Sequence, residues 1–257
     1  MTMLHIAYLY PTVMNLYGDI GNIRCLQDRC QRRGIEVVVS EIGLGEPLDP
    51  EGFDLMFVGG GQDREQVKVA EDLAGPKGDA LRQAVEAGAV ALAVCGGYQL
   101  LGRFYRPAVG EDLPGLGIFD LWTVHPGPAA TRCIGNLAVR WGSGTLVGFE
   151  NHGGRTHLGP GVRALASVIH GHGNNAEDGT EGAVYRNAYG TYLHGPLLPK
   201  NPHFADHLIG LALARAGQTA PLAPLDDELE WRAHRAALSL ARQEAWARRV
   251  GLRFLVS

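Results

Sequence analysis

The stretch from Ala89 to Gly102 constrains the fold more than any other part of the sequence. Six small or apolar residues, 89–94, lead directly into Cys95, and two glycines follow it. A buried parallel strand has this continuous apolar character, and glycines after a strand allow a tight turn into a helix. Cys95 would then form the tip of a nucleophile elbow, where a helix N-terminus favours the thiolate. The alternative is a core cysteine that ends a buried strand, and the two glycines favour the nucleophile.

Strand and helix patterns alternate through the first hundred residues. Apolar runs typical of strands lie at residues 4–10, 35–42, 53–58 and 89–94. Helical spacing lies between them at residues 20–34, and a further helix ends over residues 80–88. This alternation predicts an α/β fold with a mostly parallel central sheet flanked by helices. Sites in such sheets lie beyond the carboxyl ends of the strands.

Three consecutive glycines, Gly59, Gly60 and Gly61, follow the predicted strand at 53–58. Such a backbone can approach a ligand closely and present N–H groups to a developing negative charge. The alternative is a flexible turn. A phosphate-binding loop is excluded, because no Gly-Lys-Ser/Thr follows the glycines.

After Pro107 the pattern changes to shorter, glycine-rich segments that are typical of strands joined by tight turns. These predicted strands lie at residues 117–124, 132–141, 145–150, 162–169 and 183–193. We expect the last of them to return to the main sheet. The polar loops at 149–156 and 171–179 are candidates for substrate contacts.

His194 follows the last predicted strand and precedes Gly195. A histidine at the end of a parallel strand lies on the same rim as Cys95, so the two could reach hydrogen-bonding distance. Five other histidines remain competitors for this role: His125, His152, His157, His170 and His172.

The composition excludes several classes of protein. A hydrophobic content of 46%, a charged content of 19% and a net charge of −4 are ordinary for a globular protein and do not favour nucleic acid as a partner. The sequence shows neither a secretory signal nor an apolar run of membrane-spanning length, so we expect a cytoplasmic protein without a transmembrane segment. The four cysteines lack metal-site spacing, so no metal site is expected, and Cys25 and Cys30 are interpreted as packing residues.

The last forty residues differ from the rest of the chain. Residues 217–225 form a short proline-containing linker, and residues 226–249 have the pattern of a long helix rich in alanine and arginine. We therefore divide the chain into a domain at 1–216 and a linker with a helical extension at 217–257. The helix either covers apolar surface of its own domain, which we favour, or docks on a partner.

Taken together and in order, these motifs resemble the class I glutamine amidotransferases of the CobB/CobQ-like branch. The motifs are Gly59-Gly60-Gly61-Gln62-Asp63, Cys95-Gly96-Gly97-Tyr98-Gln99 and Thr191-Tyr192-Leu193-His194-Gly195. Further segments resemble the GatD-like glutaminase subunits of lipid II isoglutaminyl synthases. These are Tyr17-Gly18-Asp19, Gly21-Asn22, Phe149-Glu150-Asn151-His152, Asn174-Asn175 and Asp178-Gly179-Thr180-Glu181-Gly182. The likeness covers residues 3–215.

The resemblance implies a glutaminase. The Cys95 thiolate would attack the side-chain amide of L-glutamine, backbone N–H groups of Gly60, Gly61 and Gly96 would hold the oxyanion, and His194 would transfer the protons.

The resemblance also implies a binding role for Arg132, whose guanidinium could pair with the glutamine carboxylate. On spacing alone, Arg132 could equally be a surface residue. Gln99, Asn151 and His152 are further candidates for substrate binding.

Many class I members carry a glutamate two residues after the histidine, where this chain has Pro196. The CobB/CobQ-like branch also lacks it, so the resemblance implies a Cys-His dyad. We predict that no single carboxylate is as important as Cys95 or His194.

Ammonia is useful only where an acceptor is activated, and we find no likeness to an ATP-binding synthetase in this sequence. The resemblance implies a separate Mur-ligase-like MurT subunit, which would use ATP and Mg²⁺ to amidate the D-glutamate α-carboxyl of lipid II in peptidoglycan biosynthesis. No cofactor is expected in this chain itself. The alternatives are a glutaminase that serves another acceptor, such as a corrinoid carboxylate, and a non-catalytic glutamine-binding scaffold subunit.

Overall fold

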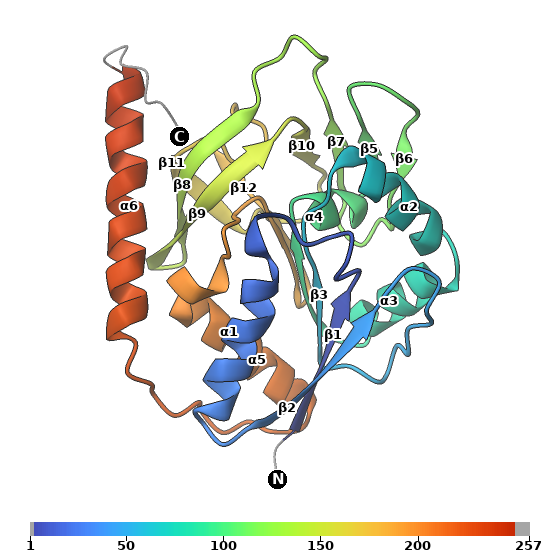
Figure 1. Cartoon of the computed structure of the whole chain (residues 1–257), viewed down its shortest axis with the longest axis vertical. Helices are drawn as coiled ribbons and strands as arrows, with labels where there is room; N and C mark the ends of the chain where they lie inside the picture. The colour runs from blue at the N-terminus through green and yellow to red at the C-terminus, as the bar shows by residue number, and fades with distance from the viewer. Residues whose placement is uncertain (1–2, 250–257) are drawn as a thin grey trace.

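The computed structural model describes residues 3–249, and its centre is a six-stranded sheet (Figure 1). The strand order is β13-β14-β4-β3-β1-β2. The strands are β1 (Met3–Leu9), β2 (Glu36–Ile42), β3 (Leu55–Val58), β4 (Val90–Val94), β13 (Ala183–Tyr185) and β14 (Ala188–Thr191). Only the β13–β14 pair is antiparallel, so the expected mostly parallel sheet is confirmed.

Helices cover both faces of this sheet (Figure 1). Helices α1 (Ile20–Gln31) and α5 (Pro202–Arg215) pack against each other, and α2 (Asp63–Leu73) packs against α3 (Pro76–Glu86). The sequence analysis did not anticipate α2. Its residues are mostly polar, and only one side of the helix, which includes Val69, Ala70 and Leu73, is buried.

The second half of the chain adds two antiparallel or mixed four-stranded sheets. One has the order β10-β7-β5-β6, with β5 (Phe104–Arg106), β6 (Leu113–Pro114), β7 (Leu121–Val124) and β10 (Arg155–Leu158). The other has the order β12-β11-β8-β9, with β8 (Cys133–Trp141), β9 (Gly144–His152), β11 (Ala166–His170) and β12 (Thr180–Glu181). The chain then returns to the main sheet through β13 and β14, as expected from the sequence.

The strand register brings the critical loops to one edge of the main sheet. Val58 of β3 pairs with Ala93 of β4, and Thr191 of β14 pairs with Val94. The Cys95 N–H donates to the Thr191 carbonyl over 2.8 Å. The glycines after β3, Cys95 after β4 and the segment after β14 therefore emerge side by side.

The long helix α6 (Glu228–Arg249) lies along the β8–β9 sheet (Figure 1). Ala241 packs against Ala138 and Val147, and the Glu244 carboxylate accepts hydrogen bonds from the backbone and side chain of Asn136. These contacts support the expectation that α6 covers apolar surface of its own domain.

The linker before α6 is also attached to the main domain. The Arg29 guanidinium, which is buried, pairs with Asp206 on α5 at 2.7 Å and with Asp227 at 2.6 Å. We propose a domain boundary between residues 216 and 217. Residues 250–257 of the predicted extension lie outside the described residues.

Candidate active site

Cys95 occupies a strained turn between β4 and the short helix α4 (Gly96–Leu100). Its φ of 50° and ψ of −105° lie outside the regions that side-chain-bearing residues normally adopt. Such strain persists only where the surrounding structure enforces it, and it concentrates at functional sites. The sulfur-bearing residue is nearly buried, but it lines a pocket. This geometry matches the elbow predicted from the sequence.

The glycines around Cys95 allow this close approach. A Cβ atom at Gly60 would lie 2.8 Å from Cε1 of His194 and 3.4 Å from Cβ of Cys95. A Cβ atom at Gly96 would lie 3.0 Å from the backbone nitrogen of Gly61. Any side chain at these positions would push the loop after β3 away from Cys95, so the close packing requires glycine.

The backbone donors beside Cys95 differ from the expected set in one respect. The N–H of Gly60 donates to Oδ2 of Asp19 over 2.7 Å, so it is not available to an oxyanion. The expectation that the Gly60 N–H stabilises an oxyanion is therefore corrected. This N–H already binds the buried carboxylate of Asp19, which lies in another segment of the chain. Within residues 3–249, the N–H groups of Gly61 and Gly96 have no protein acceptor.

His194 lies beside Cys95 and is fully buried. Its backbone exchanges two hydrogen bonds with Phe149 of β9, at 2.8 and 3.1 Å, which holds the residue after β14 in place. Burial alone would lower the pKa of His194, but the charges of the Cys95 thiolate and the Asp19 carboxylate outweigh it and raise this pKa to about 10. The imidazole of His194 is therefore positively charged at neutral pH.

The other candidate histidines lie elsewhere or have different partners. His125 and His152 line the pocket. His157 stacks on Trp122, and His172 binds the carboxylate of Glu150. Of the six histidines considered from the sequence, the structure brings His194 against Cys95.

Asp19 is a site residue that the sequence analysis did not single out for a role. Its carboxylate is fully buried, and Oδ1 lies 3.6 Å from Nδ1 of His194. Pro196 carries no carboxylate, as the sequence shows. The expected Cys-His dyad did not include Asp19, the residue just before α1, whose carboxylate lies beside His194. The only sequence signal for it was its place in the Tyr17-Gly18-Asp19 motif.

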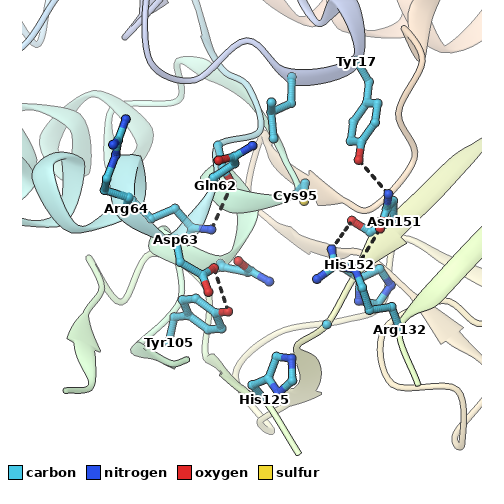
Figure 2. A pocket seen from close by; sticks show the side chains of 15 residues that line it. Tyr17, Gln62, Asp63, Arg64, Cys95, Tyr105, His125, Arg132, Asn151 and His152 are labelled. Carbon is cyan, nitrogen blue, oxygen red and sulfur yellow. Dashed lines mark hydrogen bonds between the residues drawn. The ribbon is translucent and has the colours of Figure 1, made fainter. Parts of the chain in front are cut away.

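The pocket over Cys95 has a volume of about 660 Å³ (Figure 2). On one side, Arg132 donates from Nε to Oδ1 of Asn151 at 3.0 Å, and Asn151 in turn donates to the Tyr17 hydroxyl at 2.6 Å. On the other side, Asp63 accepts a hydrogen bond from the Tyr105 hydroxyl at 3.1 Å. Figure 2 shows Arg132 and Asp63 on opposite walls, with Cys95 between them.

The remaining predicted binding residues also reach this pocket. Gln99 is buried and donates from Nε2 to the Tyr192 hydroxyl at 3.1 Å. The His152 ring stacks on the Tyr192 ring at 3.6 Å, and its Nδ1 donates to the Gly154 carbonyl. All four predicted binding residues therefore line one cavity, Arg132 and Asn151 on an exposed wall and Gln99 and His152 at depth.

Two buried glutamates lie in the polar network behind the pocket, and their environments push their pKa values apart. Burial would raise the pKa of Glu150, but the imidazole of His152 at 3.8 Å and a hydrogen bond from His172 lower it to about 2. Burial raises the pKa of Glu181 to about 7, with the Glu150 charge adding to the effect. Glu181 also accepts hydrogen bonds from the Thr191 hydroxyl and the Tyr192 N–H.

Glu181 predicts a pH dependence of stability. Because its pKa is higher in the folded protein than the usual 4.5, its stabilising contribution is complete below about pH 4.5 and is lost as the pH rises through 7. The shift corresponds to about 3 kcal/mol. We expect Glu181→Gln to reduce the fall in unfolding free energy between pH 5 and pH 8 by about 2 to 3 kcal/mol, as measured by urea denaturation. Glu111→Gln, at an exposed position, is the control; equal pH dependence in wild type and Glu181→Gln would contradict the prediction.

Cys25 and Cys30 lie in helix α1 and do not line the pocket. Burial raises the pKa of Cys25 and of Cys30 to about 12, consistent with packing residues. In the described part of the chain, no group of three or more histidine, cysteine, aspartate or glutamate side chains is arranged to hold a metal ion. None of the helices described there is both long enough and apolar enough to cross a membrane.

Comparison with known proteins identifies the family. Residues 5–202 match the CobB/CobQ-like glutamine amidotransferase domain. The chain is 41% identical over 246 residues to the GatD subunit of the glutamine-hydrolysing lipid II isoglutaminyl synthase of Staphylococcus aureus N315, covering 95% of this chain and 99% of that one. It is 39% identical over 229 residues to GatD of Streptococcus pneumoniae R6, covering 88% and 87% of the two chains.

The fold agrees with this assignment. A solved glutamine amidotransferase structure superposes with a TM-score of 0.54 at 19% identity, covering 80% of this chain and 98% of that one. At this identity the likeness concerns the fold alone, and it confirms the predicted class I amidotransferase architecture. The chain belongs to the CobB/CobQ-like glutamine amidotransferases and, within them, to the family of the GatD subunits of lipid II isoglutaminyl synthase.

Proposed function

We propose that this chain is the glutaminase subunit of a lipid II isoglutaminyl synthase. In this role it hydrolyses L-glutamine and passes ammonia to an ATP-dependent, Mur-ligase-like MurT subunit in the cytoplasm, which amidates the D-glutamate α-carboxyl of lipid II. The observation that carries the proposal is Cys95, held in a strained turn against His194 on the wall of the pocket. The near full-length likeness to two GatD subunits supports the choice of acceptor and partner.

The residues around Cys95 can perform both halves of the hydrolysis. The Cys95 thiolate attacks the side-chain amide carbon, and the N–H groups of Gly61 and Gly96 stabilise the oxyanion. The His194 imidazolium gives its proton to the amide nitrogen, and the C–N bond breaks to release ammonia and leave a glutamyl thioester. His194, now neutral, takes a proton from water as the water attacks the thioester, and glutamate leaves with regeneration of the thiolate.

The two walls of the pocket offer opposite charges for the two α-groups of glutamine. Arg132 can form a bidentate pair with the α-carboxylate. Among the described residues that line the pocket, Asp63 is the only carboxylate, and it faces Arg132 across the cavity (Figure 2). We therefore assign the α-ammonium group to Asp63, with the side-chain amide directed at Cys95. Gln99, Asn151 and His152 complete the wall between them.

This placement predicts which part of the substrate each wall recognises. We expect Asp63→Asn to lower kcat/KM for glutamine by about 10- to 100-fold, the value of one charge-assisted hydrogen bond. It should leave kcat/KM nearly unchanged for glutaramate, which lacks the α-amino group. Arg132→Gln should show the converse pattern, with selective tolerance of 4-aminobutanamide, which lacks the carboxylate.

Asp112→Asn and Arg106→Ala are matched controls, because these two residues pair with each other on the exposed surface. An Asp63→Asn enzyme that keeps the wild-type preference for glutamine over glutaramate would contradict the assignment of the ammonium group.

The acceptor is tested by the partner. We expect a Mur-ligase-like protein to co-purify with this chain, and we expect the pair to amidate a lipid II-type precursor with ATP, Mg²⁺ and glutamine. Amidation of a corrinoid carboxylate instead would keep the glutaminase and replace the acceptor. Failure of Cys95 to react with a glutamine-analogue electrophile would favour a non-catalytic scaffold.

A further inference from the structure

Asp19 is a buried carboxylate that the hydrolysis described above does not use. It lies between the short 3₁₀ turn Leu16–Gly18 and helix α1, and its side chain is fully buried. Oδ2 accepts the Gly60 N–H over 2.7 Å. Oδ1 has no hydrogen-bond partner among the described residues, and neither has Nδ1 of His194, 3.6 Å away. Two unsatisfied buried polar atoms thus face each other beside Cys95.

Because Asp19 precedes helix α1, its simplest role would be to cap that helix, but its contacts do not support this role. An aspartate that precedes a helix commonly caps it by accepting a backbone N–H of the first turn. Asp19 makes no such hydrogen bond with its side chain, and its backbone already has helical angles. Both carboxylate oxygens instead point away from α1, toward the Gly60 loop and His194.

The contact with His194 has a chemical consequence. A carboxylate opposite Nδ1 favours the tautomer with a proton on Nδ1 and stabilises the imidazolium. This leaves Nε2 as the nitrogen that exchanges a proton with Cys95 and the leaving group. The 3.6 Å separation is longer than a hydrogen bond, and such contacts often tighten only when substrate is bound.

The contact with Gly60 fixes the loop that supplies an oxyanion donor. The Asp19 carboxylate packs directly against the triple glycine, since a Cβ atom at Gly59 would lie 3.0 Å from its Oδ2. With the Gly60 N–H bound to Asp19, the next N–H along the chain, that of Gly61, remains available beside Gly96. A single side chain therefore contacts both the proton-transfer group and the oxyanion loop.

Few other charged groups face this pair. Cys95 lies on one side of His194, and the Tyr17 ring packs edge-on against its imidazole at 5.1 Å. Lys200 donates to the carbonyl of the adjacent Gly195. Tyr8 faces Asp19, and burial raises the pKa of its hydroxyl to about 12, so it stays neutral. The charge opposite Nδ1 of His194 therefore comes from Asp19.

We propose that Asp19 is a positioning residue that orients His194 through Oδ1 and holds the oxyanion loop through Oδ2, in place of the carboxylate absent at Pro196. The proposal rests on the proposed glutaminase function. It remains compatible with the expectation that no carboxylate is as important as Cys95, because Asp19 acts through His194 and does not touch the substrate.

The test is Asp19→Asn in the full chain together with its co-purified partner. Asparagine keeps an acceptor for the Gly60 N–H but removes the charge opposite His194. We expect kcat for glutamine to fall about 10²- to 10³-fold, less than the loss from removing Cys95, with KM within about threefold of wild type. The alkaline limb of the pH profile should move at least about one unit lower, because His194 loses a stabilising negative charge.

A second readout does not require turnover. We expect the alkaline step in the pH profile of Cys95 alkylation by iodoacetamide to move at least about one unit lower in Asp19→Asn, since the imidazolium beside Cys95 is then lost at a lower pH. This measurement separates the positioning role of Asp19 from the proposed glutaminase function. If the alkylation profile shifts in Asp19→Asn but the wild-type protein releases no ammonia from glutamine, the positioning role is supported and the glutaminase function is refuted. A purely structural role would lower the melting temperature and raise KM without moving either pH profile, and that result would overturn the proposal.

Asp112→Asn is the matched control for charge removal at an exposed site, and it should change neither profile. If Asp19→Asn does not fold, the histidine nitrogen spectrum of isotope-labelled wild type decides instead. At a pH above the pKa of His194, a neutral imidazole that keeps its proton on Nδ1 supports the proposal. An Nδ1 without a proton overturns it.

Discussion

Replacing Cys95 with alanine is expected to lower ammonia release from glutamine by at least about 10⁴-fold, with the fold intact. The thiolate is the only group at the end of β4 that can form the glutamyl intermediate, so no other residue can take over the first step. Alanine is smaller than cysteine and fits the same turn, although the strained φ of 50° remains. The loss should therefore appear in activity and not in the melting temperature.

Cys25→Ala is the control for this experiment. Burial raises the pKa of the Cys25 thiol to about 12, so this cysteine should neither support turnover nor react with a glutamine-analogue electrophile. Mass spectrometry of the labelled protein should place the adduct on Cys95 in wild type and find none in Cys95→Ala. Wild-type rates from the Cys95→Ala protein would refute the nucleophile.

Removal of the imidazole of His194 should have the second largest effect. We expect His194→Gln to lower kcat about 10²- to 10⁴-fold, the usual contribution of a general acid and base. Since the pKa of His194 is raised to about 10 by the Cys95 and Asp19 charges, wild-type activity should persist into alkaline solution and fall as the pH approaches that value. The variant should lose this alkaline limb. Steady-state rates between pH 6 and pH 11 measure both effects.

His157→Gln is a suitable control, because this histidine stacks on Trp122 and does not line the pocket. It should keep wild-type rates and the wild-type pH profile. An unchanged alkaline limb in His194→Gln would show that another group transfers the proton.

The sequence was sufficient to predict the elbow because the elbow depends on local pattern, whereas His194 was one of six candidate histidines until the family resemblance was considered. A continuous apolar run followed by Cys95 and two glycines has few structural solutions, and a histidine at the end of a second parallel strand must emerge at the same edge. The strand predicted at 53–58 begins only at Leu55, and the side chain of Asp54, just before it, accepts the His5 N–H.

The carboxylates of the site could not be predicted in this way. Asp19 reaches His194 from 175 positions earlier in the chain, through a contact that depends on how β1 and α1 pack on the sheet. Asp63 begins a helix that the sequence analysis missed, although its few apolar residues lie on one face of an otherwise polar segment. The use of the Gly60 N–H by Asp19 likewise follows from packing, so the sequence could indicate an oxyanion loop but could not tell which of its N–H groups stays free.

The binding role of Arg132 was ambiguous for a similar reason. Spacing could not distinguish a surface arginine from a substrate ligand, and the residue is in fact exposed and also lines the pocket. The β8–β9 register accounts for its place on the pocket wall, because Ile134 pairs with Asn151 and thereby brings Arg132 within reach of the Asn151 side chain.

The central claim is that Cys95 releases ammonia from glutamine for an acceptor activated by a partner. The most direct test measures ammonia release and acceptor amidation by wild type and Cys95→Ala, each with and without the co-purified ATP-dependent protein. We predict Cys95-dependent release and, with the partner, amidation of the lipid II-type precursor only by wild type. Equal release by both proteins, or none from wild type even with the partner, would contradict the claim.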